Sequence, residues 1–412
     1  MAQRRAAQDV PALADPSLPA DALLGPGAPA LLAAAVAAGG GELRSLTARQ
    51  TTYHPGRSLT VRYDAAVRWR GGPVTNEMLV ASAGGRLPGG GLVLDDGNHQ
   101  VAVWRVPSDP YLPGLAPALD PAAVRRLLHD LGAPVAQCTP RLRAYRPGRR
   151  AVIEVAAPGA RLFLKVVRPR SAGALHDRHR LLADHVPVPR SLGWSGELGL
   201  VALQAVGGVT LRRALDQHRG LPDGSALLSL LDRLPEPGSG TPRANGWDTG
   251  RFAALISAVA PELAARVGAV SEVLAGAEAT AEVPAVPVHG DFHEAQLLVE
   301  GGRITGLLDV DTFGLGRRVD DLATLIGHLS TLAVTSPRRW AIERYAANLL
   351  STFDRRVDPV LLRQAVAAVV LGLATGPFRV LEPAWRTTTA RRLRLAERWL
   401  ASAERLAGSP IA

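Results

Sequence analysis

Residues 287–321 read PVHGDFHEAQLLVEGGRITGLLDVDTFGLGRRVDD and place polar groups around two short apolar runs. The run at 297–299 predicts a strand, Gly301-Gly302 predicts a hairpin turn, and residues 304–308 predict the partner strand. Strands joined by so tight a turn pair along their length. The segment therefore predicts a unit in which the residues before and after the hairpin meet.

Three side chains with oxygen atoms lie at the ends of this hairpin. Asp291 precedes the first strand, Gln296 lies at its start, and Asp309 follows the second strand. Because the turn brings these ends together, we expect two carboxylates and one amide to converge on one point. Such oxygen ligands suit Mg²⁺, which is usually held by one or two carboxylates while substrate phosphates supply the rest.

Lysine is almost absent from the chain. Of the 47 basic residues, Lys165 is the one lysine and the others are arginine. Both residues serve as surface charges, but a compact ammonium on a flexible stem differs from a planar guanidinium. A site that needs a point charge near a phosphate would retain lysine; chance survival is the alternative.

These residues, in this order, resemble the signature of the aminoglycoside phosphotransferase and choline kinase-like superfamily. The resemblance rests on His289 to His293, on Gln296, on Asp309-Val310-Asp311 and on the strand Leu162 to Lys165. It covers roughly residues 121–330. It implies a protein-kinase-like fold that moves a phosphoryl group from ATP, with Mg²⁺, to a hydroxyl of a small molecule.

The resemblance also implies a role for each matching residue. Asp291 would be the catalytic aspartate that accepts or orients the proton of the acceptor hydroxyl. Asp309 and Gln296 would hold Mg²⁺, and Lys165 would pair with the α- and β-phosphates. Phosphoryl transfer is mostly positioning and electrostatic stabilisation, so these few groups are the chemical apparatus we expect.

Further residues are assigned by the same resemblance or by their neighbourhood. Gln204 and Val206 lie in a stretch that resembles the lobe-connecting hinge, whose backbone would meet adenine. Asp321 matches a family aspartate that is usually structural, and a plain helix N-cap is an equally good interpretation. Asp311 is either a further acidic group at the site or a solvated one, and His289 is expected to support the site through hydrogen bonds.

Two residues depart from the family pattern. Asn is common where Gln296 stands, and the longer side chain shifts the amide oxygen; maltokinases resemble this chain in carrying Gln there and in having an N-terminal extension. Asp177 stands where a Glu partner of the Lys165 ammonium would be expected. Asp177 either forms that ion pair, and so supports ATP binding, or is a solvated helix residue.

The pattern along the chain predicts four regions of an α+β protein. We expect a two-lobed protein-kinase-like fold with an N-terminal β-rich cap domain. Residues 1–45 would be a flexible arm with a short helix, 46–120 the cap, 121–205 the N-lobe and 206–412 a helical C-lobe. Asp120-Pro121 predicts a helix start, with Asp as N-cap.

The cap and the N-lobe share a short motif. Tyr53 to Arg57 matches Tyr145 to Arg149, and the residues around Arg105 loosely echo those around Lys165. Internal duplication and convergence on a common hairpin both explain the match. The cap has no His-Gly-Asp loop, so we predict that it packs on the N-lobe and shapes access without phosphate chemistry of its own.

Composition limits the location and the partners. The single cysteine, Cys138, excludes an intramolecular disulfide and predicts a reducing cytoplasm. The longest apolar runs, 30–38 and 365–374, are shorter than the ~20 residues that span a bilayer. The net charge of +10 comes from scattered arginine pairs, which predict a solvated surface and no nucleic-acid partner. We infer no membrane or obligate protein partner.

The identity of the acceptor follows only weakly from charge. Aminoglycosides are polycations and suit an acidic pocket, whereas this chain has a surplus of arginine. A sugar acceptor, as in maltokinases, is therefore the first expectation. An aminoglycoside or another antibiotic is the alternative, and an inactive nucleotide-binding scaffold is a second one.

Overall fold

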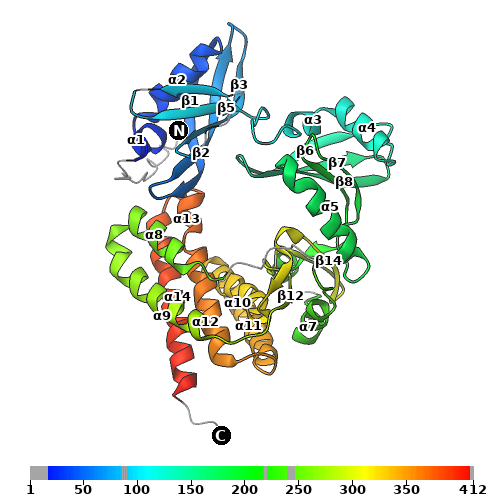
Figure 1. Ribbon diagram of the computed structural model, residues 1–412, viewed down its shortest axis with the longest axis vertical. Helices are drawn as coiled ribbons and strands as arrows, with labels where there is room; N and C mark the ends of the chain where they lie inside the picture. Colours follow the sequence, from blue (N-terminus) through cyan, green and yellow to red (C-terminus); the bar gives the residue numbers. More distant parts are fainter. Residues whose placement is uncertain are drawn as a thin grey trace.

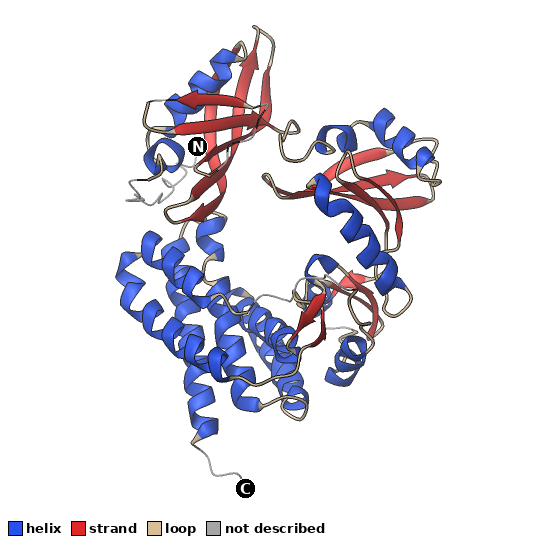
Figure 2. Cartoon of the chain, in the orientation of Figure 1, coloured by secondary structure: helices blue, strands red, loops and turns tan. Residues whose placement is uncertain are grey.

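The computed structural model shows three bodies arranged around a central space (Figure 1). They are an N-terminal cap and an N-lobe, both rich in strands, and a mostly helical C-lobe (Figure 2). The structure describes residues 17–85, 87, 89, 91–95, 97–217, 220–238 and 246–408. Residues 1–16 of the expected arm thus lie outside the described residues.

The cap is a five-stranded antiparallel sheet with helices on one face. The strand order is β1-β2-β3-β5-β4. Its elements are α1 (Ala20–Leu24), α2 (Ala28–Ala38), β1 (Gly41–His54), β2 (Ser58–Trp69), β3 (Val74–Ala83), β4 (Leu92–Asp95) and β5 (Gln100–Arg105). In β2, Leu59, Val61 and Tyr63 are buried and their neighbours less so, because alternate residues of a strand point to one face.

The first helices of the cap are packed rather than loose. Leu23 and Leu32 are fully buried, and the Tyr63 hydroxyl donates a hydrogen bond to the Leu23 carbonyl. Strand β1 already begins at Gly41. The expectation of a flexible arm is therefore wrong from residue 17 onward, because the leucine face of this segment is buried against the sheet.

The N-lobe has a second five-stranded antiparallel sheet, in the order β6-β7-β8-β10-β9. Its elements are α3 (Leu115–Leu119), α4 (Pro121–Asp130), β6 (Thr139–Arg146), β7 (Arg150–Ala157), β8 (Ala160–Val167), α5 (Pro169–Ala183), β9 (Ser191–Ser195) and β10 (Leu200–Gln204). The predicted N-cap is confirmed, since Asp120 Oδ1 accepts a hydrogen bond from the Ala123 amide at 2.6 Å. Leu115 is fully buried with the N-lobe core, so the N-lobe begins before residue 121.

The sheets of the cap and the N-lobe have the same strand order, although helix α5 of the N-lobe has no counterpart among the described residues of the cap. Each sheet follows two helices, and each has its fourth and fifth strands exchanged in spatial order. The hairpin turns of the shared motif match in conformation, with φ +66° at Gly56 and +65° at Gly148. Shared order, shared helices and a shared turn favour duplication over convergence.

The duplication identifies the cap residue that corresponds to Lys165. Lys165 pairs with Val152, and Thr60, which holds the same place as Val152 after its hairpin turn, pairs with Ser82. Ser82 therefore stands where the N-lobe has its lysine, and its hydroxyl lies 2.8 Å from that of Thr60. The match of Arg105 with Lys165 is wrong, because Arg105 lies on β5, the counterpart of β10.

The C-lobe joins two small sheets to a bundle of helices. Its strands are β11 (Val209–Thr210), β12 (Val286–Val288), β13 (Leu297–Glu300), β14 (Arg303–Leu307) and β15 (Gly314–Gly316). Its helices are α6 (Leu211–Gln217), α7 (Gly224–Asp232), α8 (Thr249–Val259), α9 (Ala264–Thr280), α10 (Arg318–Thr335), α11 (Arg339–Phe353), α12 (Pro359–Leu373), α13 (Gly376–Arg379) and α14 (Trp385–Ala407), with 3₁₀ turns at Pro261–Leu263 and Val310–Thr312. The predicted hairpin is confirmed, with Leu297 opposite Leu307 and the turn at Gly301-Gly302.

One helical stretch has the length and composition of a membrane span. It covers Pro359–Arg379, and 56% of its most apolar window is buried inside the fold. Helix α12, which forms most of it, packs against α10 and α14. The apolar composition is thus explained by a core helix.

The cap contacts both lobes. The Trp104 indole donates a hydrogen bond to the Tyr145 hydroxyl of the N-lobe at 3.1 Å. On the other side, the Tyr53 ring meets Phe378 of α13 edge-on, with centroids 6.5 Å apart. The cap therefore also closes against the C-lobe, which the sequence did not indicate.

Candidate active site

The buried carboxylate of Asp321 binds the backbone of the His-Gly-Asp loop. Asp321, in the first turn of α10, accepts hydrogen bonds from the His289 and Gly290 amides at 2.7 and 2.8 Å. Burial raises the pKa of Asp321, while the His289 charge and the two amides oppose the shift. The N-cap interpretation of Asp321 is wrong, because Arg317 precedes the helix and Asp321 anchors the loop instead.

The loop also depends on Gly290 and His289. Gly290 has φ +79°, and a Cβ there would lie 2.7 Å from the Thr312 carbonyl oxygen. A side chain is therefore excluded by both backbone conformation and space. His289 is fully buried; its Nε2 lies 2.9 Å from the Leu308 carbonyl and its Nδ1 accepts the Asp291 amide at 3.3 Å. The His289 imidazole thus fixes the backbone of Asp291.

Lys165 joins the two lobes through two carboxylates. Its Nζ lies 2.7 Å from Asp309 and 2.5 Å from Asp311. Arg150 contacts the same pair, at 2.9 Å to Asp309 Oδ2 and 2.9 Å to Asp311 Oδ2. Asp311 is therefore part of the cluster rather than solvated. Sequence reasoning missed Arg150; its place directly after the Gly148 turn was the available signal.

The electrostatics of this cluster favour ionised carboxylates. Burial alone would raise the pKa of Asp309, but the charges and hydrogen bonds of Lys165 and Arg150 hold it well below its usual value. Asp309 itself has a left-handed backbone, with φ +57°, at the start of the 3₁₀ turn. A non-glycine residue in that region is uncommon and often marks a functional position.

The Gln296 side chain lies beside the Asp309 carboxylate, as the hairpin predicted. Its Nε2 lies 3.4 Å from Asp309 Oδ2 and 3.3 Å from His293 Nε2. The backbone oxygen of Gln296 accepts the Leu308 amide at 2.8 Å and so ties both strand ends together. Rotation of the side-chain amide by 180° exchanges its oxygen and nitrogen, so it can present an oxygen beside Asp309. The Asp309 carboxylate and the Gln296 amide belong to the donor types that Mg²⁺ prefers.

Asp177 does not belong to the cluster. It is exposed on α5, and within the described part of the chain it forms no ion pair with Lys165. Its neighbour Arg178 takes the connecting role instead, because its Nη1 donates to the Asp311 backbone oxygen at 2.8 Å. The expected Lys165–Asp177 pair is therefore wrong: the helix turns Asp177 outward, and Asp309 and Asp311 satisfy the lysine.

The expected hinge lies where the chain passes from β10 to the C-lobe. Val201 of β10 is directly opposite Lys165. Gln204 is three residues further along, about 10 Å at the rise of a strand. The amides of Gln204 and Ala205 donate to the carbonyls of Arg190 and Arg161, while Val206 is partly exposed and follows the strand. The stretch from Gln204 to Val206 therefore links β10 of the N-lobe to the C-lobe.

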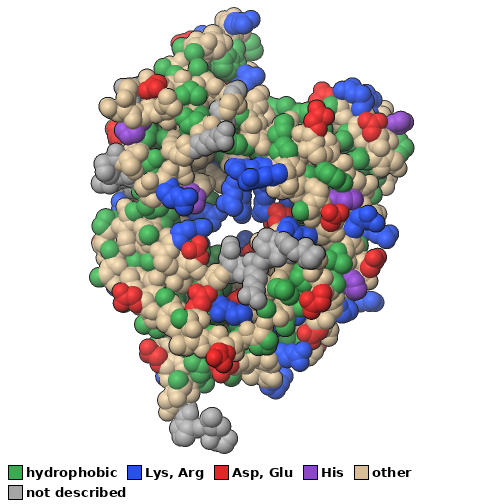
Figure 3. Space-filling model, in the orientation of Figure 1, with side chains coloured by type: hydrophobic (Ala, Val, Ile, Leu, Met, Phe, Trp, Pro, Cys, Tyr) green, Lys and Arg blue, Asp and Glu red, His purple; other side chains and the backbone are tan. Residues whose placement is uncertain are grey.

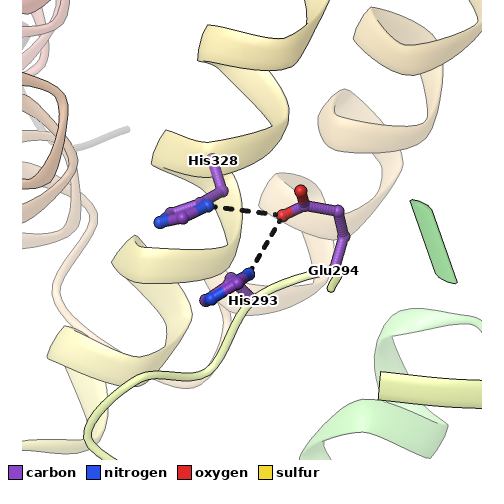
Figure 4. Close-up of side chains that lie close together, drawn as sticks. All are labelled: His293, Glu294 and His328. Atoms are coloured by element: carbon purple, nitrogen blue, oxygen red, sulfur yellow. Dashed lines mark ion pairs between the residues drawn. The ribbon is translucent and has the colours of Figure 1, made fainter. Parts of the chain in front are cut away.

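The buried carboxylate of Glu294 lies between His293 and His328, and His293 also contacts Asp291. Figure 4 shows His293 and His328 directed at Glu294, with Nδ1 to Oε2 distances of 3.6 and 3.5 Å. The two rings stack with centroids 4.0 Å apart, and His293 Nε2 is 3.7 Å from Asp291 Oδ1. Glu294, which sequence reasoning missed, is fully buried and also pairs with Arg212. Burial would raise the pKa of Glu294, but the nearby His293 and His328 rings and the charge of Arg212 hold it far below its usual value.

Two cavities meet at Asp291. The first, of about 780 Å³, is lined by the Gly148 turn, Arg150 and Asp311, and we call it the hairpin cavity. The second, of about 460 Å³, is lined by Trp247 and Phe252, and we call it the aromatic cavity. Asp291, whose side chain is 42% exposed, lines both. Figure 3 shows Lys and Arg side chains gathered around the hollow between the three bodies.

The comparison with protein families agrees with this geometry. A model described as the phosphotransferase enzyme family matches residues 141–359, more than half of the chain. The chain belongs to the phosphotransferase enzyme family. The match covers most of the N-lobe and the C-lobe through α11, and it leaves the cap outside. No curated protein matches this phosphotransferase.

Solved structures similar to this phosphotransferase include three aminoglycoside phosphotransferases. APH(4)-Ia in complex with ADP and hygromycin B is 15% identical, with 68% of this chain and 98% of that chain covered and a TM-score of 0.46. The gentamicin complex of APH(2")-IIa is 13% identical, with 68% and 98% covered and a TM-score of 0.47. Aminoglycoside-3'-phosphotransferase of type VIII is 21% identical, with 60% and 93% covered and a TM-score of 0.40.

Proposed function

We propose that the chain is an ATP- and Mg²⁺-dependent kinase that phosphorylates a hydroxyl of a small molecule. The observation that carries this proposal is the position of Asp291, at the junction of the hairpin cavity and the aromatic cavity. A phosphoryl donor on one side and a hydroxyl acceptor on the other would then meet at one carboxylate. Family membership supports the class of reaction.

The residues divide between the two substrates. Lys165 would pair with the nucleotide phosphates, and the backbone near Gln204 and Val206 would meet the base. Asp309 and Gln296 would hold Mg²⁺, whose charge neutralises the phosphate oxygens when it is bound. Asp311 and Arg150 complete the charge balance of that cluster, since both already contact each other there at 2.9 Å.

Asp291 would act on the acceptor. Its carboxylate accepts or orients the proton of the attacking hydroxyl, as general-base residues within hydrogen-bond reach do. The loop that carries Asp291 is fixed by Asp321 and by the His289 imidazole. His293 contacts the Asp291 carboxylate and the buried Glu294 on its two ring nitrogens, so it limits the movement of the Asp291 side chain. Positioning of this kind is the main source of rate in phosphoryl transfer.

A sugar is the acceptor that we favour over an aminoglycoside. Phe252 and an edge of the nearly buried Trp247 line the aromatic cavity, and the cavity also carries several arginines. A polycationic aminoglycoside would meet like charges there. The maltokinase-like preference stays a prediction. We also propose that the enzyme acts in the cytoplasm.

Asp291→Asn tests the proposal. The variant keeps the shape of the loop but removes the base, so ADP release with an acceptor should fall by at least about 100-fold. Binding of Mg-ATP, measured by titration calorimetry, should change by less than about twofold. A variant that turns over at the wild-type rate contradicts the assignment. A wild-type chain that binds Mg-ATP but releases no ADP with any acceptor supports the inactive scaffold instead.

A further inference from the structure

The aromatic cavity has a strongly basic lining. Its arginine side chains come from the N-lobe hairpin and from the C-lobe helices α8 and α13. The arginines are Arg146, Arg149, Arg251 and Arg379, and the histidines His54 and His328 also line the cavity. Burial and the neighbouring arginines lower the pKa of His54, so it adds no charge near neutral pH. The acidic side chains are Asp291 and Asp320. Basic groups therefore outnumber the acids at the place where the acceptor would lie.

The acids of the cavity do not neutralise this charge. Asp320 is already engaged, because it accepts hydrogen bonds from Arg317 Nε and from the Trp247 indole, both at 2.9 Å. Asp291 is the proposed base and faces the hairpin cavity as well. Of the four arginines, Arg251 has an acidic partner, Asp248 at 3.2 Å, and that pair is exposed.

The other three arginines form no direct ion pair within the part of the chain that the structure describes. Among the described residues, Arg146, Arg149 and Arg379 form no ion pair and no side-chain hydrogen bond. Partial desolvation and the charges of Arg146, Arg149 and Arg251 lower the pKa of Arg379. Partial desolvation and neighbouring arginines likewise lower the pKa of Arg149. The carboxylates of Asp291, Asp309 and Asp311 partly offset the desolvation of Arg146. The charges that act on Arg149 and Arg379 are those of other arginines, and such guanidinium groups are stabilised by an anion that accepts their hydrogen bonds.

We infer that the acceptor carries an anionic group, held in the aromatic cavity by Arg379 together with Arg149 and Arg251. The inference rests on the proposed function and specifies its substrate class: a small polyhydroxylated molecule with a carboxylate or a phosphate. Its ring lies against Phe252, and its anionic group lies on the arginine side. The hydroxyl to be phosphorylated points to Asp291.

The nucleotide does not account for Arg379. Arg146, Arg149 and Arg251 line both cavities and can also contact the nucleotide phosphates. Arg379 lines the aromatic cavity and does not line the hairpin cavity. It sits at the C-terminal end of α13, beside the Phe378 contact with the cap. Arg379 is therefore the residue that separates acceptor binding from nucleotide binding.

The test uses probes that share one ring and differ in charge: glucose, glucosamine, glucuronate and glucose 6-phosphate, with the matching set built on maltose. Binding to the full-length chain is measured by calorimetry in saturating Mg-AMP-PNP, and turnover by ADP release. We expect the anionic member of a set to bind at least about tenfold more tightly than its neutral member. Arg379→Gln should weaken that binding by about 10- to 100-fold, with the Kd of Mg-AMP-PNP changed less than about twofold.

Arg126→Gln is the matched control, because it removes the same charge from an exposed position on α4. It should leave the affinity for the anionic probes unchanged. The inference is wrong if no anionic probe binds more tightly than its neutral counterpart, if glucosamine binds best, or if AMP-PNP displaces the anionic probes. These outcomes differ from failure of the proposed function, in which Mg-AMP-PNP itself does not bind or Asp291→Asn leaves turnover unchanged.

Discussion

The Lys165 ammonium lies 2.7 Å from the Asp309 carboxylate, although 144 positions separate the two residues in the chain. Lys165 belongs to β8 of the N-lobe, and Asp309 follows β14 of the C-lobe. The ammonium is 7% exposed and the carboxylate 13% exposed, so their attraction is only partly screened by solvent. The pair therefore fixes how the two lobes face each other as well as the charge of the site.

Asp309→Ala should weaken Mg-ATP binding. The change removes the proposed metal ligand and leaves the Lys165 ammonium with Asp311 alone. We expect the Kd for Mg-ATP to rise by about 10- to 100-fold, measured by calorimetry over a range of Mg²⁺ concentrations. Asp177→Ala is the control, since that exposed carboxylate lies outside the cluster, and its Kd should stay within about twofold. Equal effects of the two substitutions would contradict the assignment of the metal site.

Asp109 should control the hairpin turn of the N-lobe. This buried carboxylate accepts the Tyr145 hydroxyl at 2.7 Å and the Gly148 amide at 2.8 Å. Asp109→Ala leaves both donors unpaired, so we expect a loss of about 3 kcal/mol in the free energy of unfolding and weaker ATP binding. Tyr145→Phe removes one of these bonds and also the bond from the Trp104 indole, so it should cost about 2 kcal/mol. Urea denaturation checks both; a smaller loss for Asp109→Ala than for Tyr145→Phe would refute the role.

His179 should make the fold sensitive to mild acid. Its Nδ1 donates to the Pro189 carbonyl at 2.8 Å, and burial, aided by the Lys165 charge, lowers its pKa from 6.5 to about 4. Between these values the unfolded chain binds more protons than the folded one. The stability from neutral His179 is thus complete above pH 6.5 and is lost as the pH falls toward 4, by about 3 kcal/mol.

The comparison that isolates this effect is His179→Asn, whose side-chain amide can still donate to Pro189. Urea denaturation from pH 7 to pH 4 should show a shallower loss of stability in this variant than in the wild type. His185→Asn, at an exposed position, should follow the wild-type curve. If the three curves fall in parallel, His179 does not titrate as its burial implies.

Removal of the cap should destabilise the kinase lobes. The deletion should end at residue 105, because Leu112 and Leu115 are buried in the N-lobe core. Loss of the cap exposes Phe378 and Tyr145, which the cap covers. We therefore expect a lower unfolding temperature, lower solubility and weaker acceptor binding. Differential scanning calorimetry and ADP release measure this. A truncated chain with unchanged stability and activity would make the cap an independent module.

The local pattern of the sequence determined the parts of the site that lie close together in the chain. The hairpin and the approach of Gln296 to Asp309 followed from a glycine turn between two apolar runs, because such a turn leaves the strands one way to pair. The single lysine and its place before the His-Gly-Asp loop pointed to the family. The glycine turn and the motif residues can be read from short stretches of sequence, so they can be recognised before the fold is known.

Tertiary structure decided which charges meet across the lobes. Asp177 was a reasonable partner for Lys165 by position in the chain, but helix α5 turns it to solvent, and Asp309 and Asp311 take its place. The contact of Tyr53 with Phe378, which closes the cap on the C-lobe, likewise has no local signal. The energy of a charge pair or a ring contact depends on distance in space and on solvent, and neither quantity is set by spacing along the chain.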